Sequence, residues 1–231
     1  LGLTLDYGPY GFIDAYVPDF VCNHSDPGGR YALDQQPAVG YWNLQKLAQA
    51  LADQVDGEAL AGALAQYEHQ LMLHYSELMR ARLGLAVWEE EDPALFRELF
   101  RLLASQGVDY HLFLRRLGEV TQQGDLPTSL LALLPDPALW QQWLALYRAR
   151  LVREGGEDAA RKRQMDAVNP KYVLRNALAQ QVIDAAETGN MAPFERLFAA
   201  LQRPYDEQPE YEDLATPVPQ WYCGGELSCS S

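Results

Sequence analysis

Residues 92–103 read DPALFRELFRLL, and this stretch carries the signals of an α-helix with one buried face. Asp92 and Pro93 form a helix start, with aspartate expected at the N-cap and proline at the first helical position. Apolar side chains then recur at helical spacing as far as Gly107, where a helix is expected to end. The stretch therefore predicts a helix over 92–106.

Similar signals extend outward in both directions and predict a mainly α fold. Upstream, we expect helices over 39–51 and from Asp56 or Gly57 to a stop at Gly84. Downstream, we expect helices over 109–122, 136–151, 169–183 and 192–202, with a solvated charged break over 155–163. The Trp and Leu stripes of 95–151 predict a hydrophobic core and not a cofactor site.

The two ends of the chain differ from this helical middle. Residues 1–37 are rich in Gly, Pro, Asp and aromatic side chains, which predicts a short strand over 1–5 followed by a long ordered loop. The tail from Arg203 is acidic, Pro-rich and aromatic, and is expected to be extended and ordered. The predicted parts are therefore 1–37, a helical region over 38–202, and a tail over 203–231.

Composition narrows the function classes. Hydrophobic residues make up 48% of the chain, enough for a sizeable core. The 32 acidic and 18 basic residues give a formal charge of -14, which disfavours nucleic acid as a partner. No apolar run has the roughly 18–20 residues of a membrane helix, so no membrane partner is expected. Three cysteines without a secretory signal predict a bacterial-type cytoplasmic location.

Asp6-Tyr7-Gly8 is the triplet that points to chemistry. In kinase-fold enzymes, an Asp-aromatic-Gly triplet after a strand supplies a carboxylate ligand to the magnesium that bridges nucleotide phosphates. A carboxylate suits this task because magnesium prefers oxygen ligands. The triplet alone is weak evidence, since a strand end followed by a turn has the same pattern.

Longer stretches of the sequence support a functional interpretation of the triplet. Residues 3–16 read LTLDYGPYGFIDAY, and the strings PDFVCNHSD (18–26), GRY (29–31) and QPAVGYWNL (36–44) come after them. Near the other end stand NPKYVLRN (169–176), RPYDEQP (203–209) and SCSS (228–231). Together they resemble the selenoprotein O family, also called YdiU-type proteins, over essentially the whole chain.

The resemblance implies the C-terminal helical lobe of a protein-kinase-like (α+β) fold. It implies an enzyme that transfers AMP from ATP to Ser, Thr or Tyr hydroxyls of proteins, with Mg²⁺ or Mn²⁺ as cofactor. Asp6 is then a metal ligand that also contacts ATP through the metal. The family's general-base Asp, its metal-ligand Asn and its N-lobe do not occur in this sequence. The general base is therefore expected upstream of Leu1, and this chain alone is expected to be inactive.

The resemblance also implies a redox disulfide between Cys22, in the loop after Asp6, and Cys229, near the end of the chain. Two unpaired thiols in a reducing cytoplasm remain the alternative. Cys223 is expected to be a bystander, although a Cys223–Cys229 pair competes with the first pairing.

The remaining polar residues give weaker signals. His24 is more simply a loop residue than a metal ligand, and His111 carries no signal. Lys171 and Arg175 either pair with tail acids such as Glu207, Glu210 or Glu212, or lie on a solvated salt-bridge face. Two rival functions stay open: a non-catalytic helical scaffold or pseudokinase module that binds partner proteins, and a conventional phosphotransferase.

Overall fold

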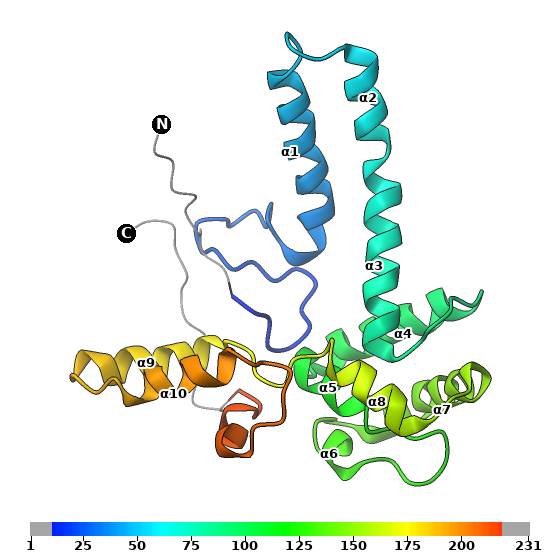
Figure 1. Cartoon of the computed structure of the whole chain (residues 1–231), viewed down its shortest axis with the longest axis vertical. Coiled ribbons are helices and arrows are strands. Elements are labelled where there is room, and N and C mark those ends of the chain that lie inside the picture. Colours follow the sequence, from blue (N-terminus) through cyan, green and yellow to red (C-terminus); the bar gives the residue numbers. More distant parts are fainter. Residues whose placement is uncertain (1–10, 219–231) are drawn as a thin grey trace. The chain divides into compact units, whose positions relative to one another are not determined.

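The computed structural model describes residues 11–218, and these are mainly helical, as the sequence predicts (Figure 1). The α-helices are α1 (Gln36–Ala50), α2 (Gly57–Ala65), α3 (Tyr67–Leu83), α4 (Asp92–Gln106), α5 (Tyr110–Leu117), α6 (Thr128–Leu131), α7 (Pro137–Glu154), α8 (Asp158–Asp166), α9 (Asn176–Glu187) and α10 (Ala192–Leu201). Two 3-10 helices, η1 (Leu33–Gln35) and η2 (Pro209–Leu214), accompany them. β structure in residues 11–218 is limited to one isolated antiparallel bridge, between Ala15 and Asp109.

The described residues form two compact units. The first covers Pro18–Met79, with the loop after residue 18, α1, α2 and most of α3. The second combines Gly11–Val17 with residues 80–218. The predicted strand over 1–5 lies outside the described residues, and the three-part division of the chain stays a prediction.

Helix ends follow local side-chain chemistry where the sequence predicts them well. Asp56 caps α2 by accepting hydrogen bonds from the backbone N–H groups of residues 58 and 59. Asp109 and Asp136 cap α5 and α7 in the same way. α3 and α4 end before Gly84 and Gly107, whose φ angles of 70° and 59° suit glycine.

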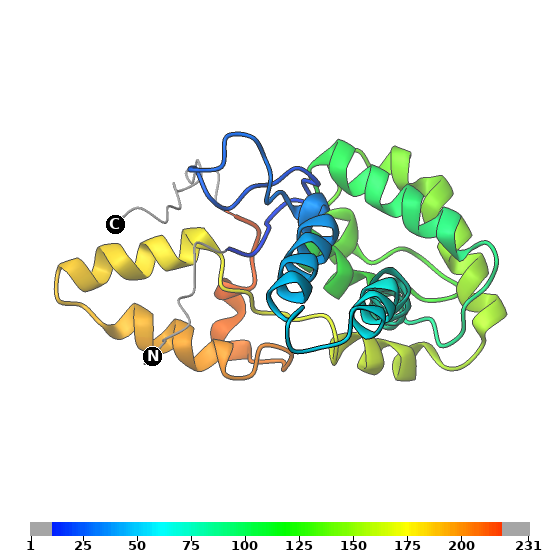
Figure 2. The same ribbon diagram turned by 90° about the horizontal axis from the view of Figure 1, so that it is seen from above.

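The core of the second unit is built around α4, α5 and α7. Figure 2 shows these helices from above. Trp140, Trp143 and Tyr147 of α7 are fully buried, and Phe113 of α5 contacts both tryptophan rings. The indole N–H of Trp143 donates to the Leu95 carbonyl at 2.9 Å, so its polar edge is satisfied. The aromatic stripe is therefore core, as predicted.

Two helix starts differ from the prediction. Asp92 is not an N-cap: it lies inside α4, is 1% exposed, and pairs with Arg150 at 2.8 Å. No helix starts at Asn169, because its side chain donates to the Arg82 carbonyl and the Lys171 backbone N–H donates to the Pro204 carbonyl. Long-range hydrogen bonds replace the local helix there, and α9 begins at Asn176.

Further differences concern lengths and charged segments. The helix predicted from residue 57 to 83 divides at Gln66 into α2 and α3. α5 ends at Leu117, where the N–H groups of residues 118–120 donate to carbonyls three residues back, and the Gln122 N–H bonds to the Asp158 carboxylate. The predicted charged break contains α8, which buries Arg161 and Met165 on one side. The predicted extended tail is wrong over Pro209–Leu214, which forms the 3-10 helix η2.

None of the helices within residues 11–218 has the length and apolar character needed to cross a bilayer.

Candidate functional site

Asp6, the predicted metal ligand, lies outside the described residues, and so do Cys223 and Cys229. The structure does describe the chain after Asp6: the segment Gly11–Val17 in the second unit and the loop from Pro18 in the first. Within residues 11–218 no cluster of three or more His, Cys, Asp or Glu side chains is arranged to hold a metal ion. The segments that continue from Asp6 are therefore the part of the candidate site that lies within residues 11–218.

The segment Gly11–Val17 is fixed to the start of α5 by backbone hydrogen bonds. The N–H of Tyr110 donates to the Asp14 carbonyl at 2.9 Å, and the N–H of Tyr16 donates to the Val108 carbonyl at 3.3 Å. The Tyr16 ring also lies against Phe100 and Tyr110, with centroids 4.9 and 5.8 Å apart. This part of the chain is thus held by both its backbone and its side chains.

Arg175 joins this segment to the rest of the unit. Its guanidinium is 2.8 Å from carboxylate oxygens of both Asp14 and Asp109, and the Arg175 side chain is only 4% exposed. We call these three residues the Arg175 cluster. Burial raises the pKa of Asp14 above its usual value, while the hydrogen bond and charge of Arg175 act in the opposite direction. Arg175 therefore stabilises two carboxylates that would otherwise repel each other.

The Arg175 cluster settles one alternative left open by the sequence. Arg175 is buried, so the solvated salt-bridge face is wrong for it, and its partners are not the tail acids. Nothing local in the sequence indicates these partners, because Asp14 lies 161 residues away.

His111 lies beside the same segment and has an unusual environment. It is 8% exposed, and neither ring nitrogen has a hydrogen-bond partner among the described residues. Its ring meets Phe12 and Tyr110 edge to face. Burial, then the charges of Arg175 and Arg82, lower the pKa of His111 to about 4, so the ring is neutral at pH 7. No pattern in the sequence singles out this residue.

Lys171 does pair with the tail, as one of the predicted alternatives has it. The Lys171 ammonium contacts the carboxylates of Glu207 and Glu212, and Arg115 contacts Glu207 at 2.7 Å. Burial opposes ionisation of Glu207, but the hydrogen bonds from Lys171 and Arg115 prevail and lower its pKa to about 2. The predicted alternative Glu210 has no ion pair with Lys171 among the described contacts.

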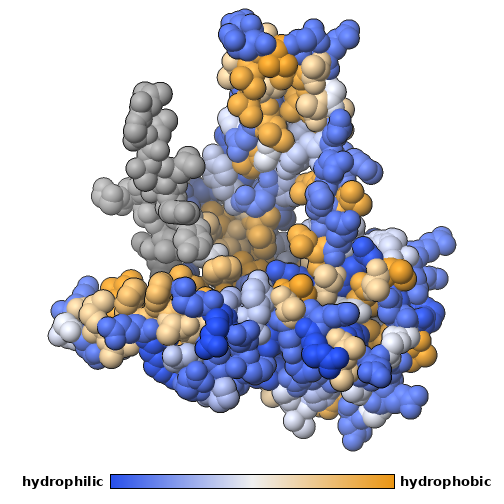
Figure 3. Space-filling view, in the orientation of Figure 1, coloured by the Kyte–Doolittle hydropathy of each residue, from blue (hydrophilic) through white to orange (hydrophobic). Residues whose placement is uncertain are grey.

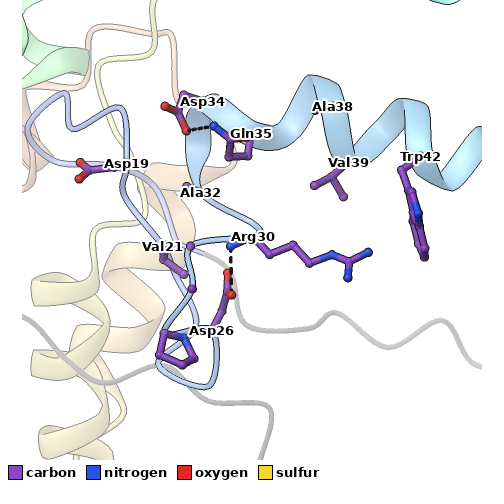
Figure 4. Close-up of a pocket in the computed structure, with 13 residues that line it drawn as sticks. Asp19, Val21, Asp26, Arg30, Ala32, Asp34, Gln35, Ala38, Val39 and Trp42 are labelled. Carbon is purple, nitrogen blue, oxygen red and sulfur yellow. Dashed lines mark hydrogen bonds between the residues drawn. The ribbon is translucent and has the colours of Figure 1, made fainter.

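In the first unit, the loop after Pro18 and the start of α1 line a pocket of about 740 Å³ (Figure 4). Asp26 holds the loop in a tight turn by accepting hydrogen bonds from the backbone N–H groups of Arg30 and Tyr31. The Arg30 guanidinium lies 4.6 Å from the centre of the Trp42 ring. Asp19 and Asp34 add acidic groups to the lining, so the pocket is polar on one side and aromatic on the other.

Cys22 and His24 belong to this loop. Among residues 11–218, neither is part of a group of His, Cys, Asp or Glu side chains that could hold a metal ion. Cys22 is half-buried. Its predicted partner Cys229 lies outside the described residues, as does the competing pair Cys223–Cys229. The disulfide therefore stays a prediction.

The comparisons with known proteins identify the family. Residues 1–202 match the family described as "Protein adenylyltransferase SelO", and the chain belongs to this family. The match includes Asp6 and nearly all of the described helices, and it confirms the resemblance seen in the sequence.

Several curated relatives carry the name "Protein nucleotidyltransferase YdiU". The protein of Aeromonas salmonicida is 86% identical to this chain over 231 residues. The proteins of Pectobacterium atrosepticum and Vibrio cholerae are 50% identical over 231 residues and 46% identical over 237 residues. Each alignment covers 100% of this chain but only 48–49% of the relative. The chain thus spans about half the length of the curated relatives it matches.

Proposed function

We propose that this chain works as part of a protein adenylyltransferase that transfers AMP from ATP to Ser, Thr or Tyr hydroxyls of proteins. The observation that carries the proposal is the family match over residues 1–202, which includes the Asp6-Tyr7-Gly8 string. The names of the relatives describe nucleotidyl transfer and support the same reaction class. We also propose that the part acts in a bacterial cytoplasm, within a kinase-like fold.

Asp6 is the residue proposed to hold the metal, Mg²⁺ or Mn²⁺, and through it ATP. A carboxylate oxygen suits either ion, and a divalent cation supplies charge neutralisation at the phosphates. The described residues add no cluster of ligands. By the resemblance to the family, we expect the other ligand and the general base in the part of the relatives that this chain does not cover, and we propose that this chain alone does not transfer AMP.

The segment Gly11–Val17 continues the chain after the Asp6 string and belongs to the second unit. Asp14 stands eight residues after Asp6 in sequence, and Arg175 and the Ala15–Asp109 bridge hold its segment in place. Within the second unit, residues 11–17 are therefore fixed to the start of α5.

The test uses a chimera in which this chain replaces the matching part of the Aeromonas salmonicida relative. Protein substrates are incubated with ATP labelled at either the α- or the γ-phosphate. Label from the α-phosphate supports AMP transfer. Label only from the γ-phosphate would instead support a phosphotransferase, and no label would support a non-catalytic scaffold.

Asp6→Ala in this chimera should lower the rate of AMP transfer by more than about 100-fold. Replacing a residue that merely supports a metal ligand already lowers metal affinity or activity by about 10–100-fold, and loss of the ligand itself should cost more. Asp53→Ala, an exposed carboxylate in the turn after α1, is the matched control and should leave transfer unchanged. Normal activity of the Asp6 variant would remove this residue from the mechanism.

We further propose that Cys22 and Cys229 form a redox pair in this family member. Their Cα atoms must then approach to within about 7 Å in the oxidised state. Mass spectrometry of the non-reduced chimera should find one peptide pair joining the two residues, which disappears in Cys22→Ser. A link between Cys223 and Cys229 in its place would contradict this pairing.

A further inference from the structure

The helices of the first unit expose an unusual number of apolar side chains. α1 contains no buried residue, although Tyr41, Trp42, Leu44, Leu47 and Leu51 lie on or directly after it. Leu47 is 54% exposed, and the others are 37–43% exposed. Figure 3 shows hydrophobic side chains gathered over the upper part of these helices.

The apolar residues of α1 do not lie on a single stripe. Leu44, Leu47 and Leu51 follow one face at helical spacing, while Trp42 points from a different position around the helix. Helices that are apolar on more than one side are buried in the complete protein. Lys46 is the one charged residue within Gln36–Ala50, so charge does not explain the exposure.

α1, α2 and the part of α3 in the first unit form a helical hairpin (Figure 1), and α3 also exposes apolar side chains. Met72, Leu73 and Leu78 are 55%, 43% and 64% exposed. The two arms are joined near the base, where the Tyr67 hydroxyl donates to the Pro37 carbonyl at 2.9 Å. Gly40 makes this approach possible, since a Cβ there would lie 2.5 Å from the Tyr67 hydroxyl. The hairpin is therefore a built structure with uncovered apolar sides.

The second unit provides the contrast within the same chain. Its helices α4, α5 and α7 each bury five or more side chains, so they are covered by the chain itself. The first unit has no comparable set on α1. Within the first unit, as far as the structure describes it, α1 is not covered.

We propose that the hairpin face, defined as Leu44, Leu47 and Leu51 of α1 with Met72 of α3, packs against the part of the family's chain that this sequence does not span. The curated relatives are about twice as long, because the alignment with all of this chain covers only 49% of the 86%-identical protein. Large contiguous apolar patches on a protein surface mark sites that a partner covers. The proposal rests on family membership and not on the proposed reaction.

The composition of the hairpin face fits a permanent intramolecular contact. α1 carries one charged residue, Lys46, in its 15 residues, in keeping with the depletion of charged residues at the core of an obligate interface. A second copy of this chain is a weaker candidate, since each copy carries a formal charge of -14 and two copies repel each other.

Methionine oxidation in the chimera tests the proposal within a single molecule. Met72 on the hairpin face and Met191 before α10 are 55% and 47% exposed, so peroxide should oxidise them at similar rates if nothing covers the face. The proposal predicts that Met72 reacts at least about tenfold more slowly than Met191 in the monomeric chimera, because oxidation follows exposure. Rates are read by peptide mass spectrometry.

Equal rates for Met72 and Met191 would overturn the proposal. Protection of Met72 that disappears on dilution would also overturn it, because a second copy would then be the occupant. A matched pair of variants gives an independent readout: Leu47→Asp should lower the melting temperature of the chimera by several degrees, and Leu146→Asp on α7, which is equally exposed at 53%, should not. Equal effects of the two variants would count against a covered α1.

Discussion

Replacing Arg175 by methionine isolates the contribution of the Arg175 cluster. Methionine keeps much of the side-chain volume but removes the guanidinium that lies 2.8 Å from both Asp14 and Asp109. Removing one partner of a buried ion pair costs about 3–5 kcal/mol, because an unpaired charge stays buried. The Asp14 side chain is 30% exposed, which favours the lower end of that range. We expect a loss of about 3 kcal/mol in unfolding free energy, or a melting temperature lower by about 6–12 °C for a chain of this size.

The pH dependence of this loss arises from Asp14. Its pKa in the folded state is already above the ordinary 3.8, and without Arg175 the opposing effect is lost and the pKa rises further. A carboxyl with a raised folded pKa stabilises the fold below its unfolded pKa and loses that contribution as pH rises. The deficit of Arg175→Met should therefore be smaller at about pH 4 than at about pH 7.

Urea unfolding of this chain at the two pH values measures the effect. Arg175→Met combined with Asp14→Asn should be more stable than Arg175→Met alone, since the unpaired charge is removed. The control is Arg196→Met, whose ion pair with Asp213 is exposed and should cost less than about 1 kcal/mol. The reasoning is refuted if Arg175→Met costs less than about 1 kcal/mol, or if its deficit does not change with pH.

Two further predictions concern the tail and a glycine. The pKa of Glu207 is about 2 in the folded state against 4.5 in the unfolded state, so its stabilising contribution is present above pH 4.5 and falls toward pH 2. When the unfolding free energy is measured at decreasing pH, Glu207→Gln should therefore lose less stability than the wild type. Gly84→Ala should destabilise the second unit by at least about 1 kcal/mol more than Gly107→Ala, as measured by urea unfolding. Both glycines have positive φ, but a Cβ at Gly84 would lie 2.7 Å from a buried arginine side chain, while at Gly107 nothing lies within 4 Å. Equal losses for the two glycine variants would show that the neighbouring side chains adjust freely.

Local signals in the sequence predict the helix ends that depend on nearby atoms. Asp56 and Asp136 cap helices because each carboxylate reaches N–H groups two or three residues ahead. Gly84 and Gly107 end helices because glycine tolerates a positive φ. Such interactions need no knowledge of the rest of the chain, so residue order alone reveals them.

The same local rules fail where a distant partner outcompetes them. Asp92 has the pattern of an N-cap, but its carboxylate pairs with Arg150, 58 residues away. Asn169 has the pattern of a helix start, but its side chain bonds to the backbone of Arg82, 87 residues away. In both cases a long-range partner replaces the local cap, although Oδ1 of Asn169 stays buried with no hydrogen-bond partner among the described residues.

The sequence by itself determined the family, the mainly helical class and the Asp6 string on which the proposed chemistry rests. Only the tertiary structure decided that Arg175 is buried between two aspartates, that His111 is a neutral buried ring, and that α1 has no buried residue within the part of the chain that the structure describes. The physical reason is distance along the chain: motifs and caps are encoded within a few residues, whereas burial and ion pairing arise when residues far apart in sequence meet.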